Sequence, residues 1–400
     1  MTFTDLGLDA RLVSRLETLG LTRPTPIQAR AIPPALDGRD VLGIAQTGTG
    51  KTAAFGLPLV TALAAEAHRP APKTARGLVL APTRELATQI VTTLQGLAPD
   101  LRINLVVGGK SLNAQAGRLA RGTDILVATP GRLIDLMDRR AVDLGQTRFL
   151  VLDEADQMLD IGFVHALRRI APCLRAERQT MMFSATMPRQ MAELARTYLS
   201  DPVRVEVSPP GQAAEKVAQS VHFVPKEDKQ ALLIDLLDAH RDDRALVFSR
   251  TKHGAERLMK QLDRAGFAAA SIHGNKSQGQ RDRALSAFRD GTVRVLVATD
   301  VAARGIDIPG VGHVYNYDLP NVPENYVHRI GRTARAGRDG RAVAFCARDE
   351  MADLHAIEKV LAARIDVAGG TRWHEPAAAP KPAGRGRRRP RRRPARHAAA

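Results

Sequence analysis

The sequence predicts an α/β protein of two domains, each a parallel sheet flanked by helices, followed by a disordered basic C-terminal tail. Segments with strand and helix character alternate twice, over residues 75–207 and again over 219–367, which is the pattern of parallel sheets covered by helices. A chain of 400 residues is also long for one hydrophobic core. We therefore expect a first domain at 1–207, a linker at 208–218, a second domain at 219–370 and a tail at 371–400.

Charge and composition narrow the class of protein. The net charge is +17, and Pro376–Ala400 holds eight Arg and one Lys without any acid, so a polyanionic partner is expected. Cys173 and Cys346 are lone and far apart, which indicates neither a disulfide framework nor a zinc site. The sequence has no signal-peptide pattern and no apolar run of about 18 residues, so we expect a cytoplasmic protein without membrane spans.

The first candidate site follows an apolar, strand-like run that ends at Ala45. The segment Ala45-Gln46-Thr47-Gly48-Thr49-Gly50-Lys51-Thr52 then opens a helical stretch, which is the strand–loop–helix context of a phosphate-binding P-loop. Its glycines would let backbone N–H groups converge on an anion. Lys51 would reach the β- and γ-phosphates of a nucleotide, and Thr52 would ligate Mg²⁺. The alternative is a Gly-rich turn before an ordinary helix.

The residues before this loop suggest a side chain that recognises the base of a nucleotide. Leucines at positions 8, 12, 16 and 19 predict one amphipathic helix over Phe3–Gly20. Pro24 and Pro26 then fix a short extended stretch ahead of Gln28. A Gln amide can donate and accept hydrogen bonds at once, which suits the N6/N7 edge of adenine. A solvated surface Gln is the alternative.

Strands of the first domain end in polar or glycine-rich segments, and ligands of parallel sheets bind at such carboxyl ends. The clearest case is the buried run Phe149–Leu152, which is followed by Asp153 and Glu154. Asp153 would hold Mg²⁺ opposite the P-loop and Glu154 would orient or deprotonate the attacking water, unless both acids only cap the next helix. The strands expected here are Gly77–Ala81, Arg102–Val107, Asp124–Ala128, Phe149–Leu152, Thr180–Phe183 and Val203–Val207.

The second domain repeats the alternation without a P-loop. A helix is expected at Lys252–Ala265, ending at Gly266. Further along, His328-Arg329-Ile330-Gly331-Arg332-Thr333-Ala334-Arg335 carries three arginines at i, i+3 and i+6. On one helix they would share a face, which is either a solvated basic stripe or a set of groups aimed at phosphate. The expected strands are Ser220–Val224, Ala245–Ser249, Ala268–His273, Arg294–Ala298, His313–Asn316 and Ala342–Cys346.

Residues 153–156 read Asp-Glu-Ala-Asp, and together with the other motifs they make the sequence resemble the DEAD-box ATP-dependent RNA helicases. It looks most like their bacterial RhlE-type branch, and the resemblance extends from residue 3 to about residue 367. It implies two RecA-like domains that clamp ATP, with Mg²⁺, and single-stranded RNA between them. The implied activity is ATP hydrolysis that drives local unwinding of short RNA duplexes or remodelling of RNA–protein complexes.

The resemblance also implies roles for single residues at the ATP site. Phe3, Pro26 and Gln28 match the adenine-sensing motif, and Asp307 matches the residue that bonds the ATP ribose. Arg329 and Arg332 match arginine fingers that reach the γ-phosphate from the second domain. Ala334 replaces a Gly that is common in the family, at what we expect to be a helix position. Coupling of the ATP site to strand opening is implied for Asp156, Ser184, Thr186 and His328.

RNA contacts to sugar and phosphate are implied in both domains, which would make binding tolerant of sequence. In the first domain they are Pro82, Thr83, Arg84, Gly108, Gly109, Thr129 and Arg132. In the second domain the matching residues, which touch RNA or brace its surface, are Arg250, Gln278, Arg281, Thr299 and Asp300.

Two rival functions and two open points remain at this stage. A non-catalytic RNA-binding scaffold would not require Lys51, Glu154 and Arg332, and a DNA-directed helicase would not require the adenine-reading Gln28. Single-stranded and duplex RNA are the expected partners, and ribosomal or RNA-decay assemblies are expected as further ones. The basic tail is either a tether for structured RNA, which we favour, or a solubilising extension.

Overall fold

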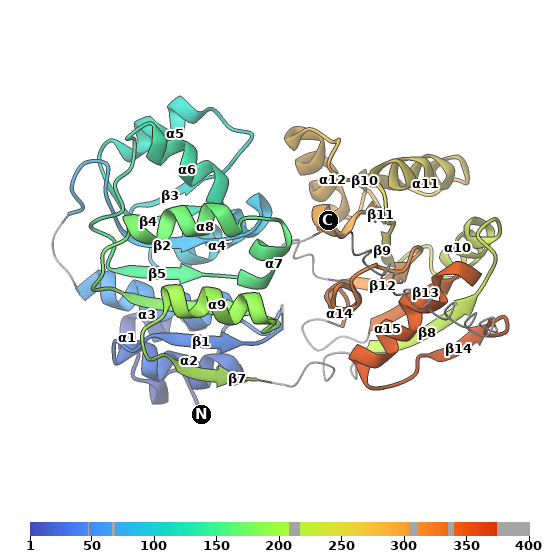
Figure 1. Ribbon diagram of the computed structural model, residues 1–400, viewed down its shortest axis with the longest axis horizontal. Coiled ribbons are helices and arrows are strands. Elements are labelled where there is room, and N and C mark those ends of the chain that lie inside the picture. Colours follow the sequence, from blue (N-terminus) through green and yellow to red (C-terminus); the bar gives the residue numbers. More distant parts are fainter. Residues whose placement is uncertain (47, 66–68, 208–216, 304–309, 335–339, 374–400) are drawn as a thin grey trace, which may run out of the picture.

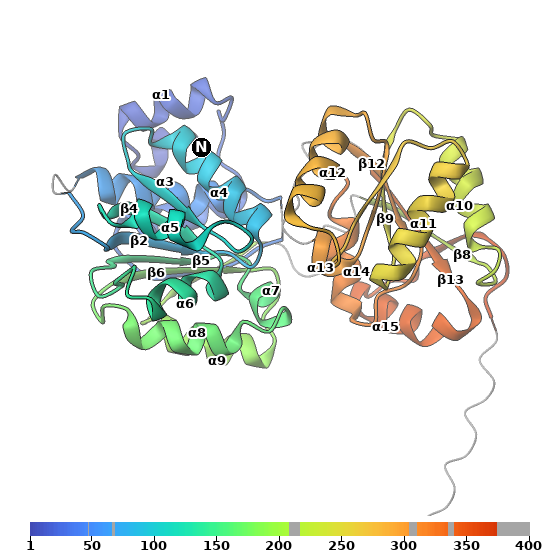
Figure 2. The ribbon, with the colours of Figure 1, turned by 90° about the horizontal axis from the view of Figure 1, so that it is seen from above.

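The computed structural model describes residues 1–46, 48–65, 69–207, 217–303, 310–334 and 340–373. Within these ranges the chain forms two α/β domains that lie side by side (Figures 1 and 2). Each domain is built on a seven-stranded sheet, and neighbouring strands in both sheets are parallel. The predicted fold class is therefore confirmed for the two sheets. Residues 208–216 of the expected linker (208–218) and residues 374–400 of the expected tail (371–400) lie outside the described residues.

The strand order of the first sheet is β3-β4-β2-β5-β6-β1-β7. This order sets the ends of β5, β6 and β1 next to one another, so residues that follow these strands can meet at one edge. Strands β2 and β5 are buried along almost their whole length, as expected for a sheet covered on both faces. The strands are β1 (Val41–Ile44), β2 (Ala75–Leu80), β3 (Ile103–Val106), β4 (Thr123–Ala128), β5 (Phe149–Leu152), β6 (Gln179–Ser184) and β7 (Val203–Glu206).

Helices cover the first sheet from both sides. Apolar side chains of α1 (Ala10–Thr18), α2 (Pro26–Leu36), α3 (Lys51–Ala65) and α4 (Arg84–Leu97) form one core with it. A second core on the other face includes residues of α5 (Leu112–Leu119), α6 (Pro130–Asp138), α7 (Ala155–Asp160), α8 (Val164–Ile170) and α9 (Arg189–Tyr198). Short 3-10 turns, η1 (Thr4–Leu6) and η2 (Ala171–Cys173), complete the domain.

The second sheet has the order β10-β11-β9-β12-β13-β8-β14. Its strands are β8 (Val217–Phe223), β9 (Arg244–Phe248), β10 (Ala269–Ile272), β11 (Val295–Ala298), β12 (Val311–Asn316), β13 (Gly340–Cys346) and β14 (Asp366–Gly369). Helices α10 (Lys229–Asp238) and α11 (Lys252–Arg264) pack on one face. The other face carries α12 (Gln278–Asp290), α13 (Asp300–Ala303), α14 (Pro323–Ile330), α15 (Met351–Leu361) and the turn η3 (Arg348–Glu350).

Figures 1 and 2 agree on which elements face the gap between the domains. Helix α7 lies at the edge of the first domain that is turned toward the second, and α14 lies at the opposing edge. Helix α7 follows directly on Asp153 and Glu154, and α14 contains His328 and Arg329 near its end.

Three expectations about elements were wrong. The single helix at Phe3–Gly20 is broken, because Gly7 adopts a left-handed conformation (φ 85°) and Asp9 caps a new helix by accepting from the Leu12 amide. Strand β14 was not anticipated. The strand β8 begins at Val217, inside the segment expected as linker.

The described ranges contain no helix that is long and apolar enough to cross a membrane.

Candidate active site and nucleic-acid groove

The glycine-rich loop joins β1 to α3, as the sequence predicts. Gly48 and Gly50 have φ angles of 87° and 91°, a left-handed conformation that glycine adopts without strain. A side chain at Gly50 would also collide with the Gln28 amide. Within the loop, the Thr49 hydroxyl donates to the Gln46 carbonyl at 2.7 Å. Thr47 lies outside the described residues.

Lys51, the first residue of α3, is 5% exposed, and its ammonium has no hydrogen-bond partner in the described structure. An ammonium that is buried without a hydrogen-bond partner has lost its solvation, which is costly, so the position suits oxygen atoms of a ligand. The helix N-terminus and the loop amides favour an anion at the same place. Nucleotide phosphates therefore fit this site.

Asp153 and Glu154 follow β5 at the adjoining edge, each only 2% exposed. Burial raises the pKa of Asp153 to about 7; the nearby Lys51 charge opposes this rise and the Glu154 charge adds to it. Glu154 has φ 50° and ψ 50°, and strain of this kind in a non-glycine residue concentrates at functional sites. Thr52 and Asp153 are the residues that could hold a hard cation here, since both offer oxygen ligands.

Asp156 ties α7 to the segment that follows β6. One of its carboxylate oxygens, Oδ2, accepts from the Ala185 and Thr186 amides at 3.1 and 2.9 Å and from the Thr186 hydroxyl at 3.0 Å. The Ser184 hydroxyl donates to the Thr186 carbonyl at 2.7 Å. These bonds connect α7, the helix that follows the two acids, to residues 184–186.

His328 of α14 reaches this segment from the second domain. It lines a small cavity together with Gln46, Ala185 and Thr186 of the first domain. Burial lowers the pKa of His328, and the charge of Asp156 opposes that effect. The four residues expected to couple the ATP site to strand opening thus lie around one junction between the domains.

Arg329 and Arg332, the two expected arginine fingers, are both buried, and they line one small cavity of the second domain. The Arg329 guanidinium bonds both oxygens of Asp300, at 2.5 and 2.8 Å. It also donates to the Asn316 side chain at 3.1 Å and the Asp318 carbonyl at 2.6 Å, and it is 2% exposed. In this arrangement Arg329 is held inside its own domain.

Arg332 lies after the end of α14, which stops at Ile330. Arg332 is 5% exposed and lines a cavity of about 20 Å³ within the second domain, together with His328, Asn325 and Arg329. The expected continuous helix face is wrong, because the chain turns at Gly331. Ala334 is likewise not helical: its φ of 55° is left-handed. Arg335, and Asp307 of the ribose contact, lie outside the described residues.

Two residues assigned to adenine have other partners in this structure. Gln28 Oε1 accepts from the Thr25 amide at 2.9 Å, and Nε2 donates to the Gly50 carbonyl at 3.0 Å. Gln28 therefore connects the start of α2 to the P-loop. Phe3 is 3% exposed and belongs to the hydrophobic core of the first domain.

All seven RNA contacts predicted in the first domain line a single groove of about 370 Å³. Arg84 lies against the glycine pair, since a side chain at Gly108 would come within 2.8 Å of its guanidinium. Thr83 caps α4 by accepting from the Leu86 amide. The seven residues are Pro82, Thr83, Arg84, Gly108, Gly109, Thr129 and Arg132, and Arg281 of the second domain lines the same groove.

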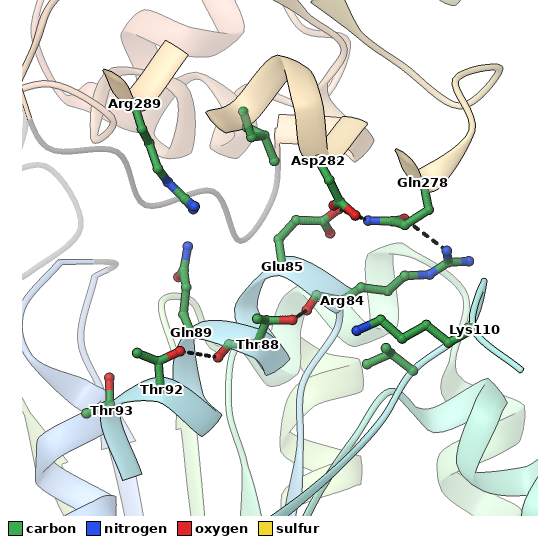
Figure 3. Close-up of a pocket in the computed structure, with 13 residues that line it drawn as sticks. Arg84, Glu85, Thr88, Gln89, Thr92, Thr93, Lys110, Gln278, Asp282 and Arg289 are labelled. Carbon is green, nitrogen blue, oxygen red and sulfur yellow. Dashed lines mark hydrogen bonds between the residues drawn. The ribbon is translucent and has the colours of Figure 1, made fainter. Parts of the chain in front are cut away.

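Polar contacts connect the two domains beside this groove (Figure 3). Arg84 donates to Gln278 Oε1 at 2.9 Å, Gln278 Nε2 donates to Glu85 at 3.3 Å, and Arg281 pairs with Glu85 at 3.0 Å. Glu85 was not anticipated as a functional residue. In the sequence, Glu85 is an acid in the first turn of a helix, and acids are common there because they interact favourably with the helix start.

The remaining second-domain residues do not line the groove. Arg250 donates to the Leu319 carbonyl and to the carboxylates of Glu350 and Asp353, at 2.9–3.2 Å, so it braces its domain. Asp300 is paired with Arg329 as described above. The Thr299 amide donates to the Ile272 carbonyl at 3.3 Å.

One cluster elsewhere has the composition of a metal site. His240, Asp243 and His313 place their potential ligand atoms within 4.8 Å of one another. However, the two imidazoles are stacked, with centroids 4.3 Å apart and planes inclined by 26°. A metal must lie close to the plane of each ring, and stacked planes do not meet at coordination distance, roughly 2 Å. His313 bonds Asp243 at 3.0 Å instead.

The structure combines a phosphate site that has buried acids, a second domain whose arginines face it, and an adjoining basic groove. These features define the class of ATP-driven nucleic-acid helicases built on two RecA-like domains. Comparisons with known proteins give the family. The model of the DEAD/DEAH box helicase family matches residues 25–194, and that of the helicase conserved C-terminal domain matches residues 228–337.

The chain is also 42% identical over 368 residues to the DEAD-box ATP-dependent RNA helicase CshA of Bacillus subtilis; the match covers 92% of this chain and 74% of the relative. The chain therefore belongs to the DEAD-box ATP-dependent RNA helicases.

Solved structures agree with this assignment. S. cerevisiae Dbp5 bound to RNA and ADP BeF3 is 31% identical, with a TM-score of 0.81 covering 92% of this chain and 95% of Dbp5. Mss116p bound to ssRNA and AMP-PNP is 28% identical, with a TM-score of 0.83 covering 92% of this chain and 78% of Mss116p. Both matches include the two domains.

Proposed function

We propose that this DEAD-box helicase clamps ATP and single-stranded RNA between its domains and, on closure, separates short RNA duplexes or remodels RNA–protein complexes. The observation that carries the proposal is the buried Lys51 ammonium, which has no partner in the described structure and lies beside Asp153 and Glu154. RNA binding is supported by the groove that the seven predicted contacts line.

At the ATP site, Lys51 would bind the β- and γ-phosphates and Glu154 would orient the attacking water and accept its proton. Thr52 and Asp153 would hold Mg²⁺, which neutralises developing charge on the phosphates. The two adjacent buried carboxylates, Asp153 and Glu154, support a cation here, because a nearby positive charge favours their ionised forms.

In the second domain we assign Arg332 as the finger and Arg329 as a positioning residue. Arg329 has most of its donors committed to Asp300, Asn316 and Asp318, so it fixes the turn that carries Arg332. Arg332 lines a small cavity of the second domain with His328, and His328 also lines the cavity that reaches the P-loop residue Gln46 of the first domain. Closure would therefore bring the finger to the γ-phosphate, and hydrolysis would release that contact.

The groove is suited to the RNA backbone rather than to the bases. Its contacts are an arginine pair, hydroxyls and backbone at two glycines, which address phosphate and sugar. A groove shaped for one strand excludes the second strand, and this would open a short duplex locally.

The test is stimulation of ATPase activity by matched RNA and DNA oligonucleotides, with Lys51→Ala as the negative control. We expect RNA to stimulate hydrolysis and DNA of the same sequence to have little effect. Equal stimulation by DNA would favour a DNA-directed helicase. Nucleotide-independent RNA binding without hydrolysis would favour a scaffold.

Finer assignments follow from the sequence alone. We propose that the chain belongs to the RhlE-type branch, acts in the cytoplasm, and works on RNA of ribosomal or RNA-decay assemblies; the relative quoted above is a CshA-type helicase. We also propose that the basic tail tethers RNA. If about half of its charges meet phosphates, deleting 376–400 should reduce the slope of log K against log[salt] by roughly 3.

A further inference from the structure

The contacts among Arg84, Glu85, Gln278 and Arg281 form a polar bridge between the domains. A second cleft, of about 560 Å³, adjoins the groove on the other side of this bridge. It lies between α4 of the first domain and α12 of the second (Figure 3). The cleft and the groove share Arg84, Glu85 and Gly108 in their walls, so the two adjoin at these residues.

Two of the cleft's positive charges are available to a ligand. Lys110 and Arg289 line it from opposite domains, both are exposed, and neither forms an ion pair with another residue of the described ranges. The acids of the cleft are bonded within the bridge: Glu85 pairs with Arg281, and Asp282 accepts from Gln278 at 2.9 Å. The net effect is a cleft that attracts anions.

Hydroxyl groups on α4 add a second preference. The Thr88 and Thr92 hydroxyls use their protons on backbone carbonyls one turn earlier, at 2.8 and 3.1 Å. Their free lone pairs can therefore only accept from a ligand. Between them on the helix, Gln89 Nε2 is buried without a partner in the described structure, and Figure 3 shows its amide directed toward Arg289.

The cleft thus combines cations and hydroxyl acceptors. An RNA backbone offers the complementary groups in alternation, namely phosphates that accept and 2′-hydroxyls that donate. We propose that this cleft binds the sugar-phosphate backbone of RNA nucleotides that flank those in the groove.

Because α4 and α12 belong to different domains, the cleft is complete only when the domains are closed. Flanking RNA would then bind mainly in the nucleotide-bound state, and it would stabilise that state in return. The enzyme would favour closure on long single strands over closure on short ones. This inference rests on the proposed function, since it requires RNA in the groove.

The test compares RNA affinities in the presence of ADP-BeF3 for oligonucleotides of about six and about twelve nucleotides, lengths within the usual range for single-strand sites. The variant is the double substitution Lys110→Glu/Arg289→Glu. The control is Arg11→Glu/Lys260→Glu, which changes the same charge on exposed residues of α1 and α11, one in each domain. The basic tail is present in all three proteins, so its contribution is common to them.

We expect the wild type and the control to bind the longer RNA more tightly, and the cleft variant to lose most of that gain. Two lost phosphate contacts should reduce the salt slope for the longer RNA by about 1.4, since each contributes about 0.7 on a single strand. With ADP in place of ADP-BeF3, the gain should be smaller in the wild type and the control, and the cleft variant should no longer differ from them.

A chimeric oligonucleotide checks the ribose preference. Replacing only the flanking half by deoxynucleotides should reduce the gain in the wild type, and Thr92→Val should make the protein less sensitive to that replacement. A cleft variant that gains as much from length as the control would overturn the inference. So would a gain that persists undiminished with ADP, or an acidic peptide that competes with the flank better than RNA does. Failure of the short RNA to bind with ADP-BeF3 would instead contradict the proposed function.

Discussion

Substitution of Arg329 and of Arg332 by alanine should damage the enzyme in two different ways. Arg329 is 2% exposed and donates to both oxygens of Asp300 and to two further acceptors. Arg329→Ala would leave the carboxylate of Asp300 and these acceptors without their donor. Arg332→Ala instead removes a group that we assign to the transition state.

The magnitude follows from the burial of the pair. Removing one partner of a buried ion pair costs about 3–5 kcal/mol, and we take the lower end because the Asp300 side chain is 25% exposed. For a domain of this size, a loss of about 3 kcal/mol lowers the unfolding temperature by roughly 6–12 °C. Arg332→Ala should have a smaller effect on unfolding but reduce turnover by about 10³–10⁵, with less change in nucleotide affinity.

The assays are thermal unfolding and RNA-stimulated ATPase turnover, completed by the double variant Asp300→Ala/Arg329→Ala. Because the two residues are directly bonded, the double variant should be less destabilised than the sum of the single variants. An Arg329→Ala protein with wild-type unfolding and lost turnover would refute the positioning role and restore Arg329 as a finger. If the destabilisation of the double variant equalled the sum of the two single variants, the energetic coupling between Arg329 and Asp300 would be refuted.

Three further outcomes are expected. Glu154→Gln cannot accept the water proton, so turnover should fall by at least about 100-fold while ATP still raises RNA affinity; RNA affinity indifferent to ATP would contradict the clamp. Ala334→Gly should stabilise the second domain by about 0.5 kcal/mol in denaturant titrations, because relief of the left-handed backbone exceeds the added entropy of the unfolded chain; a destabilised variant would exclude this account. Burial lowers the pKa of His328, so below about pH 6.5 the unfolded state binds a proton that the folded state does not, and stability is lost. As the pH falls from 7.5 to 5.5, the stability of His328→Asn should therefore rise relative to that of the wild type. A difference in stability that stays constant over this range would contradict this account.

Much of the fold is readable from the sequence because local and global signals agree. Phe149–Leu152 has the same bounds in the sequence prediction and in the structure, since an apolar run ends there in two acids. The P-loop is recognisable because its spacing leaves few alternatives. Other strand ends shift by up to three residues, as in β8, where Val217 gains a partner in Gly340 that lies far away in the sequence.

The wrong predictions share a physical cause. The spacing of residue types along the sequence does not reveal which partners the side chains have in the folded protein. Leucine periodicity at the N-terminus fits one long helix, but Gly7 interrupts it. The three arginines fit one helix face only if the helix continues past Gly331, and it does not. Strand β14 is exposed and lies at the sheet edge, so it carries almost no apolar pattern.

We propose that the polar bridge couples RNA binding to closure of the domains. Arg84 lines the RNA groove and at the same time donates to Gln278 across the interface. A guanidinium has several N–H donors in a rigid plane, so a phosphate bound on one side of Arg84 fixes the orientation of the donors on the other. RNA in the groove would thereby prepare the contact to Gln278, and closure would in turn hold Arg84 in place for the phosphate. Linkage requires the two effects to be equal in free energy. A neutral acceptor such as Gln278 also leaves the positive charge of Arg84 for the phosphate, whereas a carboxylate at that position would compete for it.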